Sequence, residues 1–370
     1  MVRRAVRAEQ SRTVTHVQQE FEGNLASVAA TTAAEYFAGQ RGRVYSSSQL
    51  ETYAECPFRF FGQNVLRLVP TEEYEEGMTA AEKGSLLHET LFEFFRSRRD
   101  RNLPPLHEVS DEDFRAAVDE AVGIARGKLE ALDIPDVFWK IEKELLLGGP
   151  SGEGILERYL RFERNREEPV RPSYFEVSFG GTPGGEEKSD SDLSTQEPVQ
   201  FGPVRLRGKV DRVDVGEGFF SVVDYKTGSV IPRMKDIIDG TSLQIPIYLH
   251  AIEELLHSRG SADLVPAGGF YCRIGKEISM DPGIVAAEFR GRAFPAGSRS
   301  KQTVQDEKEL RGVIAKTKEA VGKIVDGIAS GAFPLTRPEL VARVCTYCDF
   351  RTICRIQIMK NISPEETEEA

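Results

Sequence analysis

Hydrophobic and polar residues follow two different periods along this chain, and these predict helices in some segments and strands in others. The clearest helix is predicted over residues 79–98, because Leu87, Leu91, Phe94 and Phe95 recur on one face. Other stretches with helical spacing, or with few helix breakers, cover residues 13–37, 111–131, 136–147, 152–168, 242–258 and 302–329.

Polar residues mark the expected starts of two helices. Ser48, with Glu51 three residues later, fits a capping box, and that helix is expected to stop near Cys56. Thr241 or Ser242 is the expected cap of the helix over 242–258.

Strand-like segments lie in the second half of the chain. Residues 173–179, 199–206 and 265–274 have strand composition, whereas 180–200 is polar, aperiodic and expected to form a mobile hairpin loop. The order of helix, strand, hairpin, helix and strand, with a helical insertion after the first helix, predicts an α/β fold with a mixed sheet.

Residues 208–228, GKVDRVDVGEGFFSVVDYKTG, predict two strands joined by a tight turn. If Glu217 and Gly218 are the two loop residues, Asp211 on the first strand lies opposite Asp224 on the second. A slip in turn length would make the two carboxylates diagonal neighbours.

Asp224 and Lys226 project to the same side of their strand, because side chains alternate between faces. Two carboxylates and a lysine at one strand end suit a hard cation and a phosphate. Solvated or mutually paired charges are the alternative. Val222 and Val223 favour the first interpretation, since a carboxylate at the end of an apolar run is costly without a partner.

Composition indicates a soluble globular protein of one elaborated domain or two, with 370 residues, 40% of them hydrophobic and 29% charged. The net charge of −11 argues against indiscriminate nucleic-acid binding but allows a local basic groove. No run approaches a membrane span and no apolar segment follows the N-terminal arginines, so a cytoplasmic location without membrane attachment is predicted.

Clustered cysteines in a cytosolic protein indicate metal binding more than disulfides. Cys345, Cys348 and Cys354 form a tight triplet, and Cys56 is the natural fourth ligand because Cys272 lies in a predicted strand. Zinc, an iron–sulfur cluster and an incidental triplet all remain open, and spacing alone favours zinc. A metal held by these ligands would close a very long loop and act as a staple.

Six stretches together resemble the RecB-like nucleases of the PD-(D/E)XK superfamily, most of all the C-terminal nuclease domain of AddB-type subunits of helicase–nuclease complexes. They are SSSQLETYAECPFRFF, GSLLHETLFEFF, GKVDRVD, VVDYKTG, QIPIYLHA and CTYCDFRTIC, within about residues 45 to 355. The resemblance implies a restriction-endonuclease-like core. It also implies a 4Fe–4S cluster, which shifts the expectation from zinc to iron–sulfur, held by Cys56, Cys345, Cys348 and Cys354.

The resemblance also implies the site residues. His88, Asp211 and Asp224, with the backbone carbonyl of Tyr225, would hold one or two Mg²⁺ or Mn²⁺ ions. Lys226 would orient or deprotonate the attacking water.

Two further residues match the pattern of these nucleases. Gln244 and Tyr248, four residues apart on one helix face, would meet a phosphate or the catalytic lysine, unless they are only neighbours. Many members have Glu where this chain has Asp224, which lies within the range of the family. Glu176 is a weaker candidate, as an extra ligand or a polar strand residue.

The expected function is therefore a metal-dependent DNA exonuclease that acts on ends during double-strand-break repair and recombination. The chain lacks a GxxxxGK(S/T) phosphate loop, so a helicase partner would supply unwinding. A free-standing single-strand exonuclease like the CRISPR-associated iron–sulfur nucleases and a non-catalytic DNA-binding module are the alternatives. The expected divisions are a connecting helix in 1–44, a nuclease domain in 45–356 and an acidic tail in 357–370. The connecting helix suggests that the chain descends from, or is cut out of, a longer subunit.

Overall fold

The computed structural model describes residues 3, 6, 23–25, 34–69, 77–132, 136–150, 152–181, 188–228, 231–296, 301–346, 348–354 and 356. The chain forms two compact units. The first unit comprises Met1–Glu72, Gln200–Leu206 and Thr317–Ala370, and the second comprises Glu73–Val199 and Arg207–Lys316. The domain boundaries expected after residues 44 and 356 stay predictions, and the acidic tail lies outside the described residues.

An eight-stranded mixed sheet forms the centre of the fold, in the order β1-β4-β5-β6-β7-β8, with β2 and β3 also pairing with β4. The pairs β2–β4, β4–β5 and β6–β7 are antiparallel, whereas β5–β6 and β7–β8 are parallel. This arrangement confirms the predicted α/β class and mixed sheet. The strands are β1 Val44–Ser46, β2 Arg171–Phe179, β3 Val199–Phe201, β4 Val204–Gly216, β5 Phe219–Lys226, β6 Val265–Ile274, β7 Ile278–Ala286 and β8 Thr303–Val304.

The hairpin between β4 and β5 has the predicted register. Arg212 pairs with Val223 and Gly216 pairs with Phe219, which leaves residues 217 and 218 as the loop. Gly218 has a φ of +76°, a conformation that glycine adopts without steric cost.

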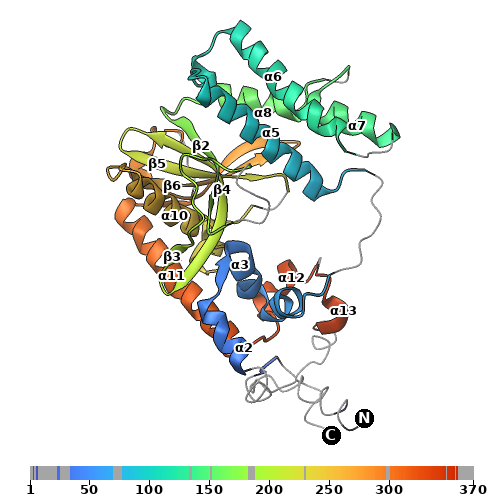
Figure 1. The fold of residues 1–370 in the computed structure, drawn as a ribbon, viewed down its shortest axis with the longest axis vertical. Coiled ribbons are helices and arrows are strands. Elements are labelled where there is room, and N and C mark those ends of the chain that lie inside the picture. Colours follow the sequence, from blue (N-terminus) through green and yellow to red (C-terminus); the bar gives the residue numbers. More distant parts are fainter. Residues whose placement is uncertain are drawn as a thin grey trace. The chain divides into compact units, whose positions relative to one another are not determined.

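Helices of the second unit cover the sheet and form the predicted insertion. Figure 1 shows α6, α7 and α8 together beside α5, and each packs on at least one of the others. They are α5 Ala80–Asp100, α6 Asp111–Glu130, α7 Asp136–Leu147, α8 Ile155–Arg164, α9 Met234–Ile238 and α10 Gln244–Ser258. The four apolar residues that predicted α5 are all buried. No helix among the described residues has both the length and the apolar character that crossing a bilayer requires.

Helices of the first unit are mostly short. They are α2 Ala34–Gly39, α3 Ser47–Glu55, α4 Pro57–Phe60, α12 Val341–Val344 and α13 Arg351–Cys354, with a π-helical turn at Phe61–Val65. The long helix α11, Glu307–Ala329, runs from the second unit into the first.

Three sequence predictions about helices were wrong in detail. A continuous helix over 13–37 is broken at Gly23, where φ is +87° and Asn24 bridges Ala332; most of its other residues lie outside the described part. The capping box at the start of α3 is formed by Ser46 and Gln49, because Ser46 ends β1 in an extended conformation suited to a cap. Helix α10 begins without a side-chain cap.

A buried ion network joins strand β4 to helix α8 and the residues that follow it in the second unit. The guanidinium of Arg212 donates hydrogen bonds to Glu163 at 2.8 and 3.1 Å and to Asp214 at 2.5 and 2.8 Å. Arg166 adds a hydrogen bond of 3.0 Å to Asp214. Removing one partner from such a network leaves an uncompensated buried charge.

We expect Arg212→Met to lower the free energy of unfolding by about 3–5 kcal/mol, because two buried carboxylates lose their main partner. Arg161→Met is the matched control, since Arg161 is 48% exposed and pairs with Glu153 and Glu157 at the surface. That change should cost under about 1 kcal/mol. Urea unfolding of both variants measures the difference, and equal losses would contradict the prediction.

Candidate active site

Three side chains from separate elements of the second unit meet in one place. His88 lies on α5, Glu176 on β2 and Asp211 on β4, and one ligand atom from each lies within 4.8 Å of the other two. The Nδ1 atom of His88 is 3.4 Å from both Glu176 Oε1 and Asp211 Oδ1. An imidazole and two carboxylates are donors that suit a divalent cation.

Strand register places the acidic residues in a row. Phe175 pairs with Arg212 and Val177 pairs with Val210, so Glu176 lies opposite Asp211. Continuing the β4–β5 register by one residue places Asp224 on the other side of Asp211. Three carboxylates therefore lie next to one another across β2, β4 and β5.

Glu176 is the residue that sequence reasoning underrated. Its backbone has a φ of +51°, which is rare for a residue with a side chain and costs about 1–3 kcal/mol. Strain of this kind recurs at functional sites, where surrounding structure enforces it. Its place on a predicted strand was the only available signal.

Lys226 begins a hydrogen-bonded chain beside this row. Its Nζ lies 2.7 Å from Asp224 Oδ2 and donates a hydrogen bond of 3.0 Å to Gln244 Oε1. The Nε2 of Gln244 in turn donates to the hydroxyl of Tyr248 at 3.0 Å. The structure thus brings together the lysine, the carboxylate and the Gln–Tyr pair named from the sequence.

Tyr225 joins the two groups of residues. Its backbone N–H donates a hydrogen bond of 2.7 Å to Asp211 Oδ2, and its ring meets that of His88 edge-on at 5.6 Å. The backbone carbonyl of Tyr225 stays a predicted ligand.

Electrostatics show the cost of gathering these acids. Burial and the nearby charge of Asp211 raise the pKa of Asp224 to about 7, although Lys226 opposes the shift. Burial alone would raise the pKa of Asp211, but His88 and the N–H of Tyr225 hold it below its ordinary value. Burial alone would lower the pKa of His88, but Asp211 and Glu176 keep it well above its usual range.

Two carboxylate oxygens of this group are placed to accept a further positive charge. Glu176 Oε1 and Asp224 Oδ2 are buried without a hydrogen bond, although each lies near a nitrogen of His88 or Lys226. Buried carboxylates are costly unless their charge is compensated. The donor set and these oxygens therefore fit a divalent cation.

A cavity of about 370 Å³ opens onto the three clustered side chains. It gives a substrate access to the carboxylates. The residues that line it are Gly84, Ser85, His88, Glu89, Phe92, Glu176, Lys188, Lys209 and Asp211.

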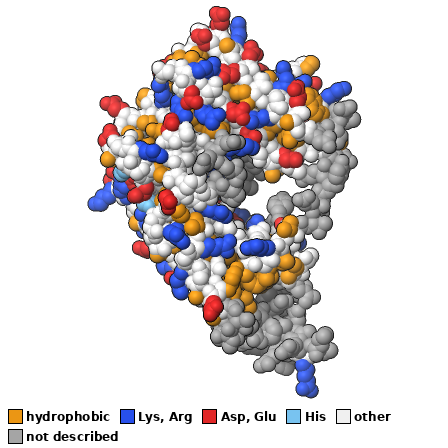
Figure 2. All heavy atoms as spheres, in the orientation of Figure 1, with side chains coloured by type: hydrophobic (Ala, Val, Ile, Leu, Met, Phe, Trp, Pro, Cys, Tyr) orange, Lys and Arg blue, Asp and Glu red, His pale blue; other side chains and the backbone are white. Residues whose placement is uncertain are grey.

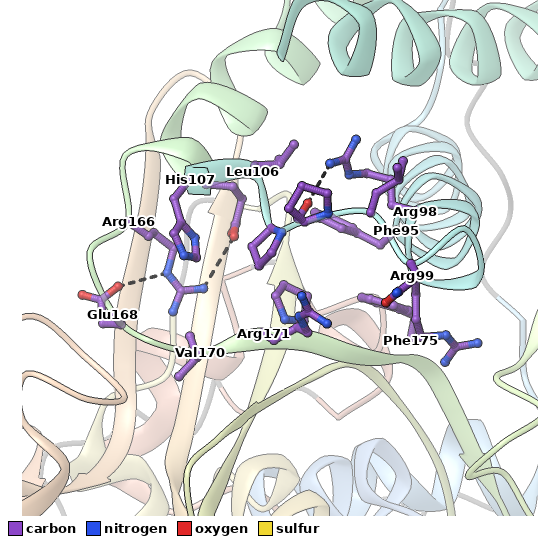
Figure 3. Close-up of a pocket in the computed structure, with 16 residues that line it drawn as sticks. Phe95, Arg98, Arg99, Leu106, His107, Arg166, Glu168, Val170, Arg171 and Phe175 are labelled. Atoms are coloured by element: carbon purple, nitrogen blue, oxygen red, sulfur yellow. Dashed lines mark hydrogen bonds and ion pairs between the residues drawn. The ribbon is translucent and has the colours of Figure 1, made fainter. Parts of the chain in front are cut away.

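A separate cavity of about 90 Å³ lies between the end of α5 and the start of β2, and arginines surround it (Figure 3). Arg99 lies 2.6 Å from Asp190 and Arg166 lies 3.2 Å from Glu168. Because Arg99 and Arg166 already have carboxylate partners, these two guanidinium groups are poorly placed to bind an anionic substrate.

The four cysteines named as cluster ligands all belong to the first unit. Cys56, Cys345 and Cys354 are buried, and Cys348 is half-buried. Burial, helped by the nearby Cys348 and Cys345, raises the pKa of Cys56 to about 11. Cys345 and Cys354 pack with four apolar side chains, namely Val341, Ile356, Phe58 and Leu335.

The early and late segments that carry these cysteines are tied together by the backbone. Phe58 N–H donates to the carbonyl of Pro334 at 3.0 Å, and the hydroxyl of Thr336 donates to the carbonyl of Glu55. The Sγ of Cys56 accepts the N–H of Arg59 at 3.4 Å. The fifth cysteine, Cys272, lies apart in β6 of the second unit.

The spacing of the cysteine sulfurs bears on which metal they fit. A tetrahedral zinc site with Zn–S bonds of about 2.3 Å holds its sulfurs about 3.8 Å apart. Within the part of the chain that the structure describes, which includes all five cysteines, no three of their sulfurs lie within 4.8 Å of one another. The group is wider than a closed zinc tetrahedron.

Comparison with known families agrees with this geometry. The family model for the PD-(D/E)XK nuclease superfamily matches residues 44–355. The chain belongs to this superfamily. Membership confirms the resemblance found in the sequence and, with the mixed sheet, the predicted PD-(D/E)XK fold. The site roles and the iron–sulfur staple stay predictions.

Several relatives of this PD-(D/E)XK nuclease domain are named as subunits of an ATP-dependent helicase/deoxyribonuclease. The protein from Carboxydothermus hydrogenoformans is 25% identical over 365 residues, which cover 85% of this chain and 31% of the relative. That from Lachnoclostridium phytofermentans is 26% identical, covering 84% and 29%. That from Symbiobacterium thermophilum is 30% identical, covering 62% and 19%. The chain thus spans less than a third of the length of these relatives.

Proposed function

We propose that this chain is a metal-dependent deoxyribonuclease that hydrolyses phosphodiester bonds at DNA ends. The observation that carries the proposal is the meeting of His88, Glu176 and Asp211 within 4.8 Å, in the cavity of a PD-(D/E)XK fold. Lys226 lies beside Asp224 on the adjoining strand β5.

His88, Glu176, Asp211 and Asp224 would hold the metal, with the carbonyl of Tyr225 as a further ligand. A divalent ion supplies a water of lowered pKa and offsets negative charge on the phosphate. The carboxylates suit Mg²⁺, and the imidazole nitrogen favours Mn²⁺ somewhat.

Lys226 positions the reacting groups. Its ammonium, held by Asp224 and Gln244, orients the attacking water and stabilises the charge that develops on the phosphate. Gln244 is itself held by Tyr248, so the pair fixes where the ammonium points. Both residues therefore act through Lys226.

The four clustered cysteines would hold a 4Fe–4S cluster. The resemblance of the cysteine-bearing stretches to those of RecB-like nucleases is the ground for this choice, and the structure keeps all four cysteines in the first unit. The cluster would staple the segment around Cys56 to that around Cys345.

The relatives named as helicase/deoxyribonuclease subunits support a role in a helicase–nuclease machine. A helicase partner would supply the unwinding, and the cytoplasm is the expected location. Figure 2 shows Lys, Arg, Asp and Glu interspersed over the helices of the insertion on the face in view. On this face DNA contact would therefore be centred on the cavity, since the mixed charges offer no broad basic surface there.

Cleavage of end-labelled single- and double-stranded DNA tests the proposed reaction. We expect cleavage with Mg²⁺ or Mn²⁺ and its loss in EDTA, because the carboxylates cannot activate water without a cation. Asp211→Asn, purified in parallel, controls for contaminating nucleases.

Three outcomes would contradict the proposal or part of it. Cleavage that persists in EDTA would exclude the metal mechanism. DNA binding without cleavage under every condition, including an added helicase partner, would favour a non-catalytic module. Cleavage of single strands that no helicase improves would favour a free-standing exonuclease.

A further inference from the structure

Lys209 makes a contact at the metal site that the proposed mechanism does not use. It lies on β4 two residues before Asp211, on the same face of the strand. Its Nζ is 2.6 Å from Glu176 Oε2. The other oxygen of the same carboxylate, Oε1, is the one near His88.

We propose that Lys209 is a placeholder cation. It holds Glu176 when no divalent ion is bound, and it moves to a phosphate of the DNA strand when an ion is bound. This inference rests on the proposed nuclease function and adds a substrate-binding residue to it.

The burial of Glu176 explains why the ammonium of Lys209 lies beside it when no divalent ion is bound. Glu176 is only 5% exposed, and a carboxylate so deeply buried needs a counter-ion. A divalent ion between His88, Glu176 and Asp211 would supply that charge in place of Lys209. It would also repel the nearby ammonium.

The exposure of Lys209 allows its ammonium to move to a phosphate when an ion is bound. The side chain of Lys209 is 36% exposed and lines the cavity, and lysine has a flexible four-carbon stem. Released from Glu176, the ammonium can reach an anion in the same cavity. A phosphodiester is the anion that the proposed reaction brings there, and lysine binds phosphate as a point charge.

Lys188 provides a matched comparison. It lines the same cavity, but its Nζ lies 2.6 Å from Glu89, which is not among the proposed metal ligands. Lys188 can therefore contact DNA without competing with the ion.

Lys209→Met and Lys188→Met in the full chain test the inference with two readouts. Mn²⁺ affinity is measured without DNA by electron paramagnetic resonance. DNA affinity is measured by anisotropy of a labelled single strand in Ca²⁺ over a range of salt, with a gel to show that the strand stays intact.

The Lys209 and Lys188 variants should differ in Mn²⁺ affinity but not in DNA affinity. We expect Lys209→Met to bind Mn²⁺ at least about threefold more tightly, because a competing positive charge is gone. It should bind DNA about tenfold more weakly, with the salt slope reduced by about one. Lys188→Met should weaken DNA binding in the same way and leave Mn²⁺ affinity unchanged.

Tighter Mn²⁺ binding together with weaker DNA binding is the result that identifies a placeholder lysine. If Lys209 were only structural, its loss would weaken the binding of both. Unchanged or weaker Mn²⁺ binding by Lys209→Met would overturn the placeholder role, and unchanged DNA affinity would overturn the move to phosphate. If Lys209→Met fails to fold, Lys209→Gln takes the same test. Failure of the nuclease proposal is seen separately, because the unaltered chain would then not cleave DNA at all.

Discussion

Lys226→Ala is expected to cleave DNA at least about a hundredfold more slowly while retaining its binding of DNA and of metal. The ammonium of Lys226 lies between Asp224 and Gln244, at 2.7 and 3.0 Å, next to the row of carboxylates. An ammonium in this position stabilises negative charge that develops during the reaction. Its removal should therefore lower the rate of cleavage more than the affinity for DNA. Single-turnover cleavage, with parallel binding of labelled DNA and of Mn²⁺, measures the change.

Neighbouring variants show whether the effect belongs to the ammonium. Gln244→Ala should slow cleavage by less, because it removes a group that holds Lys226 but leaves the charge. Tyr248→Phe should have the smallest effect of the three. Lys276 is an exposed lysine in the turn between β6 and β7, and Lys276→Ala should cleave DNA as fast as the unaltered chain. Normal cleavage by Lys226→Ala would remove this residue from the mechanism.

The hairpin was predictable because its register depends on two adjacent loop residues. With Glu217 and Gly218 in the turn, the pairing of β4 with β5 follows from counting, and Asp211 lies opposite Asp224. Local information of this kind needs no knowledge of the rest of the fold.

Glu176 could not be placed in the same way. The register of β2 against β4 shifts between Pro172 and Tyr174, and the two strands are far apart in sequence. Neither that irregularity nor the positive φ of Glu176 leaves a pattern in the residues themselves. His88 was found through family resemblance alone, since periodicity predicted only a position on an apolar helix.

Helix starts were misplaced where tertiary pairing overrides local propensity. Thr303 and Val304 pair with β7, so α11 begins at Glu307 and not at residue 302. Strand β7 itself was not predicted, since its burial pattern shows no clear alternation. Such pairings depend on partners that a pass along the sequence does not reveal.

Cys348→Ser is expected to give a colourless protein of much lower stability. Iron–sulfur clusters absorb visible light, and loss of one thiolate ligand would remove the proposed cluster. Without it, the long loop between the segments of Cys56 and Cys345 is no longer closed, at a cost on the order of 4 kcal/mol. Visible absorption of anaerobically purified protein and thermal unfolding measure the two effects.

Half-burial makes Cys348 the most informative of the four positions. Serine is close to cysteine in size, so at a half-buried site the exchange alone should change stability by no more than about 0.5–1 kcal/mol. A larger loss must therefore come from the cluster. Cys272→Ala is the control, because Cys272 is buried in β6 of the second unit and should leave the colour unchanged. A brown and stable preparation of Cys348→Ser would exclude this residue as a ligand, whereas an unaltered chain that is colourless and contains zinc would exclude the cluster itself.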